Sequence, residues 1–303
     1  MSKVLVTGGL GYIGSHTAVE LLAQGHDVVI ADNLANTSAG VLDGIEAITG
    51  KRPHWENVDL ADTGATSAFL RQHPDFDSII HFAAHKAVGE SVEKPLDYYH
   101  NNLGSLVNLL GYCREHHGCA FIFSSSCTVY GQADELPIRE NAPVKPAESP
   151  YGNTKQIGEE IIRDGAAAHG FRAIALRYFN PVGAHPSAKI GELPLGVPQN
   201  LVPFITQSAI GLRGPLKVFG NDYPTRDGTC IRDYIHVVDV AKAHILAMDR
   251  LLAGKVEEAV EVFNLGTGTG STVLEVIKAF ESATGVELQW QFADRRPGDV
   301  VEA

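Results

Sequence analysis

The stretch K-V-L-V-T-G-G-L-G-Y-I-G, from Lys3 to Gly14, decides the fold of this 303-residue chain. Lys3 to Thr7 is a short apolar run of the kind that forms a buried parallel strand. Four glycines follow within the stretch, and Ser15 to Gln24 then places apolar residues at helical spacing. Glycines let backbone N–H groups approach a pyrophosphate at a helix N-terminus, so this order of strand, turn and helix predicts a dinucleotide-binding site.

A second strand, predicted over Asp27 to Ala31, leads directly to Asp32, which lies 18 residues after Gly14. A carboxylate at this position accepts hydrogen bonds from the adenine ribose hydroxyls and repels a 2′-phosphate. The sequence therefore favours NAD over NADP. The alternative is a glycine turn that holds no ligand, which the joint presence of strand, helix and acid disfavours.

Strand-like and helix-like segments alternate through the first 180 residues, which predicts an α/β fold with a doubly wound parallel Rossmann sheet. The further predicted strands are His54 to Val58, Ser78 to Phe82, Ala120 to Ser124 and Ala173 to Tyr178. The predicted helices include Leu96 to Arg114 and Asn153 to His169. Because ligands bind at the carboxyl ends of such strands, one crevice should gather Asp32, Asp59, Phe82 to Ala84, Ser124 to Ser126, and Phe179 with Asn180.

The alternation loosens after Asn180, so we expect residues 1–180 to form the NAD-binding domain and residues 181–303 a smaller α/β substrate domain. Residues 181–203 are rich in glycine and proline, which predicts a long loop. The elements predicted beyond it are strands at Lys217 to Phe219 and Ala259 to Leu265 and helices at Asn200 to Gly211 and Val273 to Ala283. The domains should partly interleave, with residues 235–252 packing back on the large sheet.

A second informative stretch is Y-G-N-T-K, from Tyr151 to Lys155, at a predicted helix start. Residues four apart stack on one helix face, so the phenol and the ammonium should lie one turn from each other. A fixed cation favours the phenolate, and lowering a phenol pKa from about 10 to about 7 takes about 4 kcal/mol. Taken alone, such a pair is more often a core tyrosine with a solvated lysine.

The composition is that of an ordinary globular chain, with 44% apolar residues and a net charge of −12. The negative charge argues against nucleic acid or an anionic membrane as a partner, and no apolar run approaches the ~20 residues that span a bilayer. The four cysteines and 13 histidines show no metal-ligand spacing, so no metal site is expected. Reduced cysteines and a chain that starts directly with a strand predict a cytoplasmic protein.

Several longer motifs resemble those of the extended short-chain dehydrogenase/reductases. They are T-G-G-L-G-Y-I-G at residues 7–14, S-S-S-C-T-V-Y-G at residues 124–131, and Tyr151 with Lys155. Further motifs narrow the resemblance to the UDP-glucose 4-epimerases of that family. These are H-F-A-A-H-K-A-V-G-E-S at residues 81–91, R-Y-F-N-P-V-G-A at 177–184, F-G-N-D-Y-P-T at 219–225 and G-T-C-I-R-D-Y-I-H-V at 228–237.

The resemblance implies an isomerase with a tightly bound NAD that is reduced and reoxidised within each turnover. Such an enzyme converts UDP-galactose to UDP-glucose by epimerisation at C4, through a transient 4-keto sugar. By the same resemblance, Tyr151 takes the proton from the sugar 4-hydroxyl group while hydride leaves C4 for NAD. Ser126 is then the second donor to the 4-oxygen, and Lys155 tunes Tyr151 and holds the nicotinamide ribose.

The resemblance also implies which residues surround the two ligands. The NAD contacts should come from Gly8, Gly11, Tyr12, Ile13, Gly14, Asp32, Asn33, Asn36, Thr37, Asp59, Leu60, Phe82, Ala83, Lys86, Asn101, Tyr151, Lys155 and Phe179. The UDP-sugar contacts should come from Ser126, Tyr151, Asn180, Asn200, Leu201, Phe219, Arg232, Arg296 and Asp299. A homodimer through a helix pair of the large domain is implied too. Members of this group run a few dozen residues further, so we expect a substrate domain that is incomplete at its C-terminus.

Some of these residues have plain structural alternatives. Ser126 can cap the turn that follows its strand. Arg232 can pair with Asp233 at the surface, and Arg296 with Asp299, in ion pairs worth under about 1 kcal/mol.

Two other functions share the fold. A nucleotide-sugar 4,6-dehydratase is disfavoured, because such enzymes carry an Asp-Glu pair where this chain has Cys127 and Thr128. A non-catalytic NAD- or UDP-sugar-binding protein is disfavoured, because such proteins usually lose one of the residues that are present here as Ser126, Tyr151 and Lys155.

Overall fold

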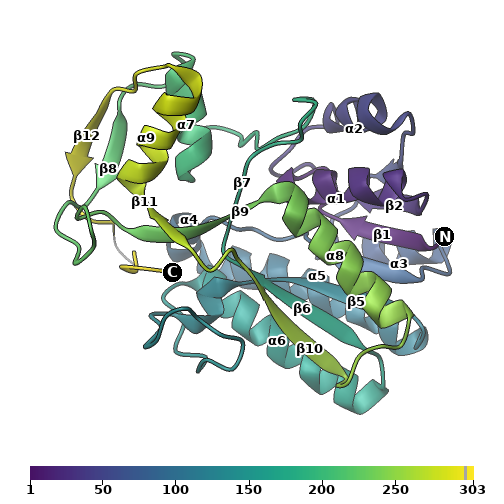
Figure 1. Ribbon diagram of the computed structural model, residues 1–303. Coiled ribbons are helices and arrows are strands. Elements are labelled where there is room, and N and C mark those ends of the chain that lie inside the picture. Colours follow the sequence, from purple (N-terminus) through teal and green to yellow (C-terminus); the bar gives the residue numbers. More distant parts are fainter. Residues whose placement is uncertain (297–298) are drawn as a thin grey trace.

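A computed structural model describes residues 1–296 and 299–303 of the chain. Its larger part is a seven-stranded parallel sheet in the order β10-β6-β5-β4-β1-β2-β3 (Figure 1). The strands are β1 (Lys3–Thr7), β2 (Asp27–Ala31), β3 (His54–Glu56), β4 (Ser78–His81), β5 (Ala120–Ser126), β6 (Ala173–Tyr178) and β10 (Val260–Leu265). This arrangement confirms the predicted doubly wound Rossmann sheet.

Helices cover both faces of this sheet. One face carries α1 (Tyr12–Ala23), α2 (Val41–Thr49) and α8 (Val237–Leu252), and the other carries α3 (Thr63–Gln72), α5 (Pro95–Glu115) and α6 (Pro150–His169). Strand β1 contributes side chains to the cores on both faces of the sheet, because successive side chains of a strand point to opposite faces. Val4 and Val6 pack into the core on the α1 side, and Leu5 packs into the core on the α5 side. All three side chains are fully buried, and such burial is worth about 1.5–3 kcal/mol each.

The smaller part contains two short sheets. One pairs β8 (Leu216–Phe219) with β12 (Trp290–Ala293), and the other joins β7 (Asn180–Val182), β9 (Ile231–His236) and β11 (Gly270–Thr272). Helices α7 (Leu201–Ala209) and α9 (Val273–Thr284) lie beside β8 (Figure 1) and share an apolar core with it. The short helix α4 (Val88–Glu93) and a 3-10 turn (Cys127–Tyr130) belong to the larger part.

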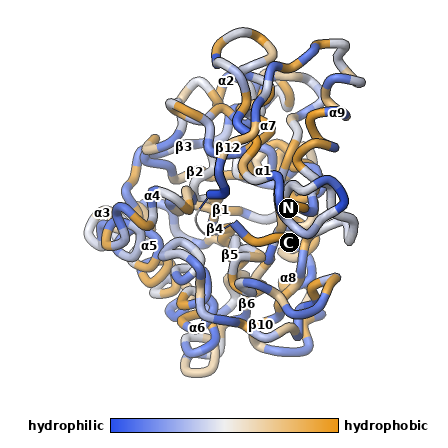
Figure 2. Tube along the Cα trace, turned by 90° about the vertical axis from the view of Figure 1, so that its left-hand side faces the viewer, coloured by the Kyte–Doolittle hydropathy of each residue, from blue (hydrophilic) through white to orange (hydrophobic). Residues whose placement is uncertain are grey.

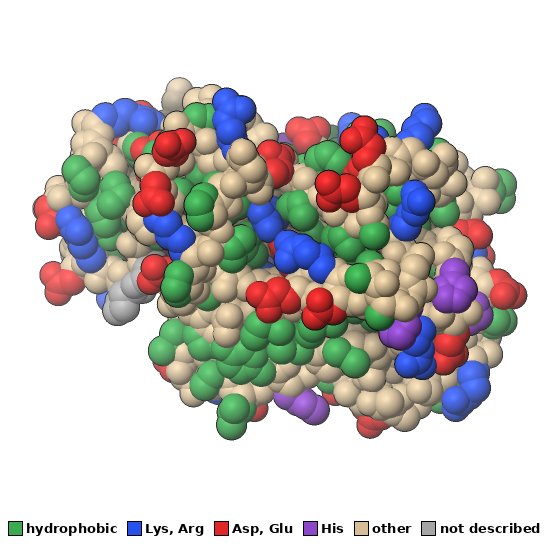
Figure 3. Space-filling model, turned by 90° about the horizontal axis from the view of Figure 1, so that it is seen from below, with side chains coloured by type: hydrophobic (Ala, Val, Ile, Leu, Met, Phe, Trp, Pro, Cys, Tyr) green, Lys and Arg blue, Asp and Glu red, His purple; other side chains and the backbone are tan. Residues whose placement is uncertain are grey.

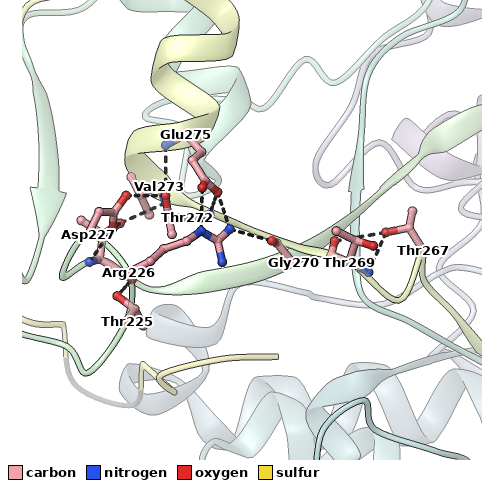
Figure 4. A network of polar contacts seen from close by, with 10 residues as sticks. Thr225, Arg226, Asp227, Thr267, Thr269, Gly270, Thr272, Val273 and Glu275 are labelled. Carbon is pink, nitrogen blue, oxygen red and sulfur yellow. Dashed lines mark hydrogen bonds and ion pairs between the residues drawn. The ribbon is translucent and has the colours of Figure 1, made fainter.

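A network of polar contacts fixes the first turn of α9 (Figure 4). Thr272 Oγ1 accepts a hydrogen bond from Glu275 N at 3.1 Å, and the Glu275 carboxylate accepts one from Thr272 N at 2.9 Å, which forms a capping box. Arg226 donates to Glu275 at 2.6 Å and to the Gly270 carbonyl at 2.8 Å. These bonds attach the loop before β9 to α9 and to β11.

Two segments late in the chain return to the large sheet. Helix α8 packs against α1 and against strands β5 and β6 (Figure 1). The strand predicted over residues 259–265 is β10, which pairs with β6 at the edge of the large sheet and not within the smaller part. Its sequence predicts a strand, but local periodicity does not specify which strand it will pair with. We therefore propose a larger unit of residues 1–179, 237–252 and 260–265, with Asn180 belonging to β7 of the smaller part.

The apolar residues are distributed according to these layers (Figure 2). The buried ones come from the inner strands and from the sides of the helices that face the sheet. Helices α1 and α6 each start three residues earlier than predicted, at Tyr12 and Pro150, directly after their N-caps Gly11 and Ser149. Within the described ranges, no helix combines the length and the apolar character needed to cross a lipid bilayer.

Candidate active site

A cleft runs along the carboxyl ends of β1, β2, β4 and β5 and gathers most of the predicted site residues. With the single exception of Phe179, all of the predicted NAD-binding residues line it. They are Gly8, Gly11, Tyr12, Ile13, Gly14, Asp32, Asn33, Asn36, Thr37, Asp59, Leu60, Phe82, Ala83, Lys86, Asn101, Tyr151 and Lys155. The crevice predicted at the strand ends therefore contains Asp32, Asp59, Phe82 to Ala84 and Ser124. Ser125, Ser126, Phe179 and Asn180, which were predicted to share it, do not line it.

The glycine turn at one end of the cleft has no room for side chains. A Cβ atom on Gly14 would lie 2.3 Å from the Gly8 carbonyl oxygen, and one on Gly8 would lie 2.8 Å from Ala83 N. Gly8 also has a φ of +64°, which side chains disfavour. No side chain caps the first turn of α1 after Gly11, so its backbone N–H groups are available to an anion at the positive end of the helix.

Asp32 holds the turn in place from the end of β2. Its carboxylate accepts hydrogen bonds from Leu10 N at 3.0 Å and Leu34 N at 2.9 Å. Burial raises the pKa of Asp32, while these backbone hydrogen bonds lower it. An ionised carboxylate has about four acceptor positions, so two further donors can bind it from the cleft side.

Tyr151, Lys155 and Ser126 meet at the other end of the cleft. Tyr151 lies in the first turn of α6 and Lys155 one turn later, with the ammonium 5.8 Å from the centre of the phenol ring. Lys155 is only 4% exposed, and it donates a hydrogen bond to the Ser124 carbonyl at 2.7 Å. Ser126 ends β5, and its hydroxyl group accepts a hydrogen bond from Thr128 N at 3.2 Å. It therefore caps the turn that follows its strand, which was the structural alternative for this residue. Its side chain also interacts with Tyr151 and lowers the pKa of that phenol.

The acid–base properties of this group differ from the expectation that Lys155 lowers the pKa of Tyr151. Burial raises the pKa of Tyr151 to about 12, although the hydrogen bond with Ser126 lowers it. Burial lowers the pKa of Lys155 to about 8. Desolvation dominates because both groups lose water and the ammonium spends its shortest bond on a backbone carbonyl. The side chains of the protein therefore leave the phenol neutral, and further positive charge is needed to favour the phenolate.

A buried ion pair supports these residues from behind. Glu159, one turn after Lys155 on α6, binds Arg177 of β6 through Nε at 2.8 Å and Nη2 at 2.5 Å. Ser125 Oγ donates to Glu159 at 2.7 Å, and Arg177 donates to Tyr130 Oη at 2.8 Å. Both side chains of the ion pair are only 3% exposed. The pair thus fixes α6 against β5, β6 and the 3-10 turn after Ser126.

Glu192 is a cleft residue that the sequence patterns did not reveal. It comes from the loop before α7, and its carboxylate accepts hydrogen bonds from Lys86 at 3.2 Å and Asn200 at 2.7 Å. It thereby joins a predicted NAD-binding residue to a predicted UDP-sugar-binding residue. Periodicity cannot show where a loop of this length passes, and only the contacts across the cleft single out this acid.

The predicted UDP-sugar residues of the smaller part form a separate group around Asp299. Arg232 approaches Asp299 at 3.5 Å, and Arg296 binds it at 3.0 and 3.1 Å. The Arg296 guanidinium also lies 5.0 Å from the centre of the Phe219 ring. The alternative pairing of Arg232 with Asp233 does not occur, because Asp233 accepts hydrogen bonds from residues 267 and 268 after β10. The alternative pairing of Arg296 with Asp299 does occur.

The remaining predicted residues lie around these two groups. Phe179 lines a second hollow, together with Asp233 and Ala303. Asn180 starts β7 and donates a hydrogen bond to the Asp233 carbonyl at 3.3 Å. Leu201 starts α7 and packs against the small apolar core. The structure thus brings the NAD set, apart from Phe179, together in one cleft. Of the UDP-sugar set, Ser126 and Tyr151 lie in the larger part, and the other residues are distributed over the smaller part.

These features define a class of protein with a dinucleotide cleft and a Tyr-Lys-Ser group at one end of it. The family profile described as "NAD dependent epimerase/dehydratase family" matches residues 4–266, and the chain belongs to this family.

The individual relatives to which the chain is similar have more specific names than the family. The UDP-glucose 4-epimerase of Bacillus subtilis is 50% identical over 298 residues, which cover 98% of this chain and 86% of the relative. The UDP-glucose 4-epimerase of Mus musculus is 48% identical, with 99% of this chain and 87% of the relative covered. The crystal structure of UDP-glucose 4-epimerase from Bifidobacterium longum in complex with NAD⁺ and UDP is 46% identical. It superposes with a TM-score of 0.94 over 99% of this chain and 89% of that chain.

Proposed function

We propose that the protein is an isomerase that epimerises a UDP-hexose at C4 with NAD, converting UDP-galactose to UDP-glucose through a transient 4-keto sugar. The observation that carries the proposal is the meeting of Tyr151, Lys155 and Ser126 at the end of a cleft whose glycine turn fits a dinucleotide. The relatives named UDP-glucose 4-epimerase, at about half identity over nearly the whole chain, support it.

The residues of the cleft fit NAD. The uncapped first turn of α1 and the glycines at 8 and 14 suit its pyrophosphate, and Asp32 has acceptor positions for the ribose hydroxyls. When bound, NAD supplies the acceptor and donor of hydride and a positively charged nicotinamide ring. Lys155, which lies beside Ser124 and Tyr151, is proposed to bind the ribose of that ring.

In the proposed reaction the side chains move one proton and hold one oxygen. Tyr151 accepts the proton of the 4-hydroxyl group as the C4–H bond breaks, and it returns the proton when the bond re-forms on the opposite face. Ser126 donates a hydrogen bond to the 4-oxygen, and this bond strengthens as the oxygen gains carbonyl character. Because burial raises the pKa of Tyr151 to about 12, the phenolate needs the positive charge that accompanies the oxidised cofactor.

The group around Asp299 is proposed to bind the diphosphate of the UDP-sugar. A guanidinium can donate two parallel hydrogen bonds to phosphate oxygens, and both Arg232 and Arg296 are held by the same carboxylate. Phe219, under Arg296, offers an aromatic face beside them. In this proposal Asn180, Asn200 and Leu201 complete the site.

The direct test is an assay without added cofactor. The purified protein should convert UDP-galactose to UDP-glucose without added NAD⁺. After the protein has been removed by filtration, UDP-glucose dehydrogenase and NAD⁺ are added, and NADH absorbance reports the product. Denatured protein should release NAD that chromatography detects. A protein that carries NAD but leaves UDP-galactose unchanged would support the non-catalytic alternative, and one that forms a 4-keto-6-deoxy sugar would support the dehydratase.

The fit of the glycine turn gives a second prediction. Gly14→Ala should lower the NAD content of the purified protein by more than about tenfold, because the added Cβ would meet the backbone oxygen of Gly8 at 2.3 Å. The matched control is Gly111→Ala on α5, where an added Cβ meets nothing within 4 Å. Equal NAD content in the two variants would contradict the placement of the cofactor on this turn.

We further propose a cytoplasmic homodimer through α5 and α6 of the larger part. Helix α5 leaves Leu96 and Val107 exposed, at 78% and 53%. Seen from below, apolar side chains gather in one continuous area of the surface (Figure 3). Light scattering coupled to size exclusion tests the proposal, and a monomeric mass at micromolar concentration would contradict it.

A further inference from the structure

Three potential metal ligands meet at the free edge of the large sheet, where β3 passes the C-terminal end of α3. They are His54 and Glu56 of β3 and His73, the residue that follows α3. The Nε2 atoms of both histidines approach the same Glu56 oxygen, at 3.1 Å for His54 and in a close contact for His73. The three donor atoms lie within 4.8 Å of one another.

The backbone explains why these side chains converge. His54 and Glu56 are two residues apart on a strand and so point to the same side. Their partners on β2 are Val29 and Ala31, which pack in the core on the α3 side of the sheet. His73 caps the C-terminus of α3, and its ring lies 5.1 Å from Phe69 and 4.8 Å from His54, measured between ring centres. Two packed elements thus hold the three ligands.

We propose that His54, Glu56 and His73 form a binding site for a divalent transition ion of the Zn²⁺ type. Two imidazole nitrogens and one carboxylate oxygen are a common zinc ligand set, with bonds of about 2.0–2.2 Å and a water in the fourth position. The opposing charges of the acid and the ion make binding favourable, whereas Mg²⁺ and Ca²⁺ prefer sites built from oxygen alone.

The exposure of the ligands suits an ion that enters from solvent. The side chain of His73 is 18% exposed, that of Glu56 28% and that of His54 55%. His73 and Glu56 are therefore the anchored ligands, and His54 is the ligand that can move by the small distance needed to close around an ion. The site is independent of the proposed epimerase activity, because none of the three residues lines the cleft.

The alternative is a metal-free cluster in which the two histidines simply hydrogen-bond Glu56. The two readings differ in what Zn²⁺ does to the protein. A bound ion would tie β3, a three-residue edge strand, to the end of α3, and so raise the melting temperature. A metal-free cluster gives no such rise.

The test is calorimetric titration of Zn²⁺ into the full-length holoprotein at neutral pH without chelators, with His54→Ala, Glu56→Gln and His73→Ala. Loss of a metal ligand should weaken the binding at this site by at least about tenfold, since even changes to outer-shell partners cost about 10–100-fold. The matched control is His169→Ala, an exposed histidine at the end of α6, which should bind Zn²⁺ as wild type does. Mg²⁺ should not compete.

A second measurement separates loss of a ligand from loss of the fold. Co²⁺ should give the visible absorption of a four-coordinate site in the wild type and in His169→Ala, and this absorption should be lost in Glu56→Gln, whose side chain keeps its shape and whose far-UV spectrum should be unchanged. A wild type without Zn²⁺ binding, or Glu56→Gln and His73→Ala variants that bind Zn²⁺ as tightly as His169→Ala, would overturn the proposal.

Discussion

Tyr151→Phe is expected to lower the turnover of UDP-galactose by about 10³-fold while the purified variant keeps its NAD. The substitution removes only the phenol oxygen, which is the group proposed to carry the proton of the 4-hydroxyl. The ring that lies 5.8 Å from the Lys155 ammonium is retained, so the wall of the cofactor cleft stays in place. The measurement is turnover per mole of bound NAD, with the cofactor quantified after denaturation.

The control for deleting a phenol oxygen is Tyr112→Phe. Tyr112 is a buried residue of α5 and accepts a hydrogen bond from Phe76 N at 2.9 Å, away from the cleft. This variant should lose some stability and keep its turnover per NAD. A Tyr151→Phe protein that has lost its NAD, or that turns over at the control rate, would show that the role of Tyr151 has been misplaced.

Glu159→Ala is expected to lower the free energy of unfolding by about 3–5 kcal/mol, because it leaves the Arg177 guanidinium buried without a counter-charge. The control is Arg163→Ala, since Arg163 binds the same carboxylate at 2.7 Å but is 46% exposed and should be worth under about 1 kcal/mol. Urea unfolding measures both. The double variant Glu159→Leu with Arg177→Met should be more stable than Glu159→Ala, because no buried charge is left unpaired.

The same pair predicts how stability changes with pH. Burial raises the pKa of Glu159, but hydrogen bonding and charge from Arg177 outweigh burial and hold this pKa below the ordinary value of 4.5. A carboxyl group with a depressed pKa stabilises the fold fully above its unfolded value and loses that contribution as the pH falls through the folded value. Wild-type stability should thus fall in acid below about pH 4.5, and the fall should be smaller in Glu159→Ala. Equal pH profiles would contradict the assignment.

The parts of the fold that sequence patterns predicted are those with a local signal. The run Lys3–Gly14 specifies strand, turn and helix from adjacent residues, and the strand-end rule then correctly predicts that Asp32, Asp59 and Ser124 share one cleft. Strand β10 shows the limit, because its sequence marks a strand while its pairing with β6 depends on the path of the whole chain. Glu192 shows a second limit, because a contact between a loop and the opposite wall of a cleft produces no periodic pattern in the sequence.

The pKa of Tyr151 could not be predicted from a Tyr-x-x-x-Lys spacing for a related reason. Spacing indicates that a cation stands nearby, but not how much water both groups lose. Once the side chains are buried, desolvation dominates, and it raises the pKa of Tyr151 and lowers that of Lys155. The histidine pair at the sheet edge is also invisible in sequence, because His54 and His73 are joined only by the packing of α3 on β3.

The late return of the chain to the large sheet affects how the protein is made. Helix α8 supplies Val240, Ile245 and Met248 to the core that α1 closes on one side, and β10 completes the sheet only with Leu265. Since a ribosome releases the polypeptide from its N-terminus, the nucleotide-binding half stays unfinished until residue 265 has been synthesised. Until then the apolar surface that α8 and β10 will cover remains exposed. This is the period in which the nascent chain most needs a chaperone.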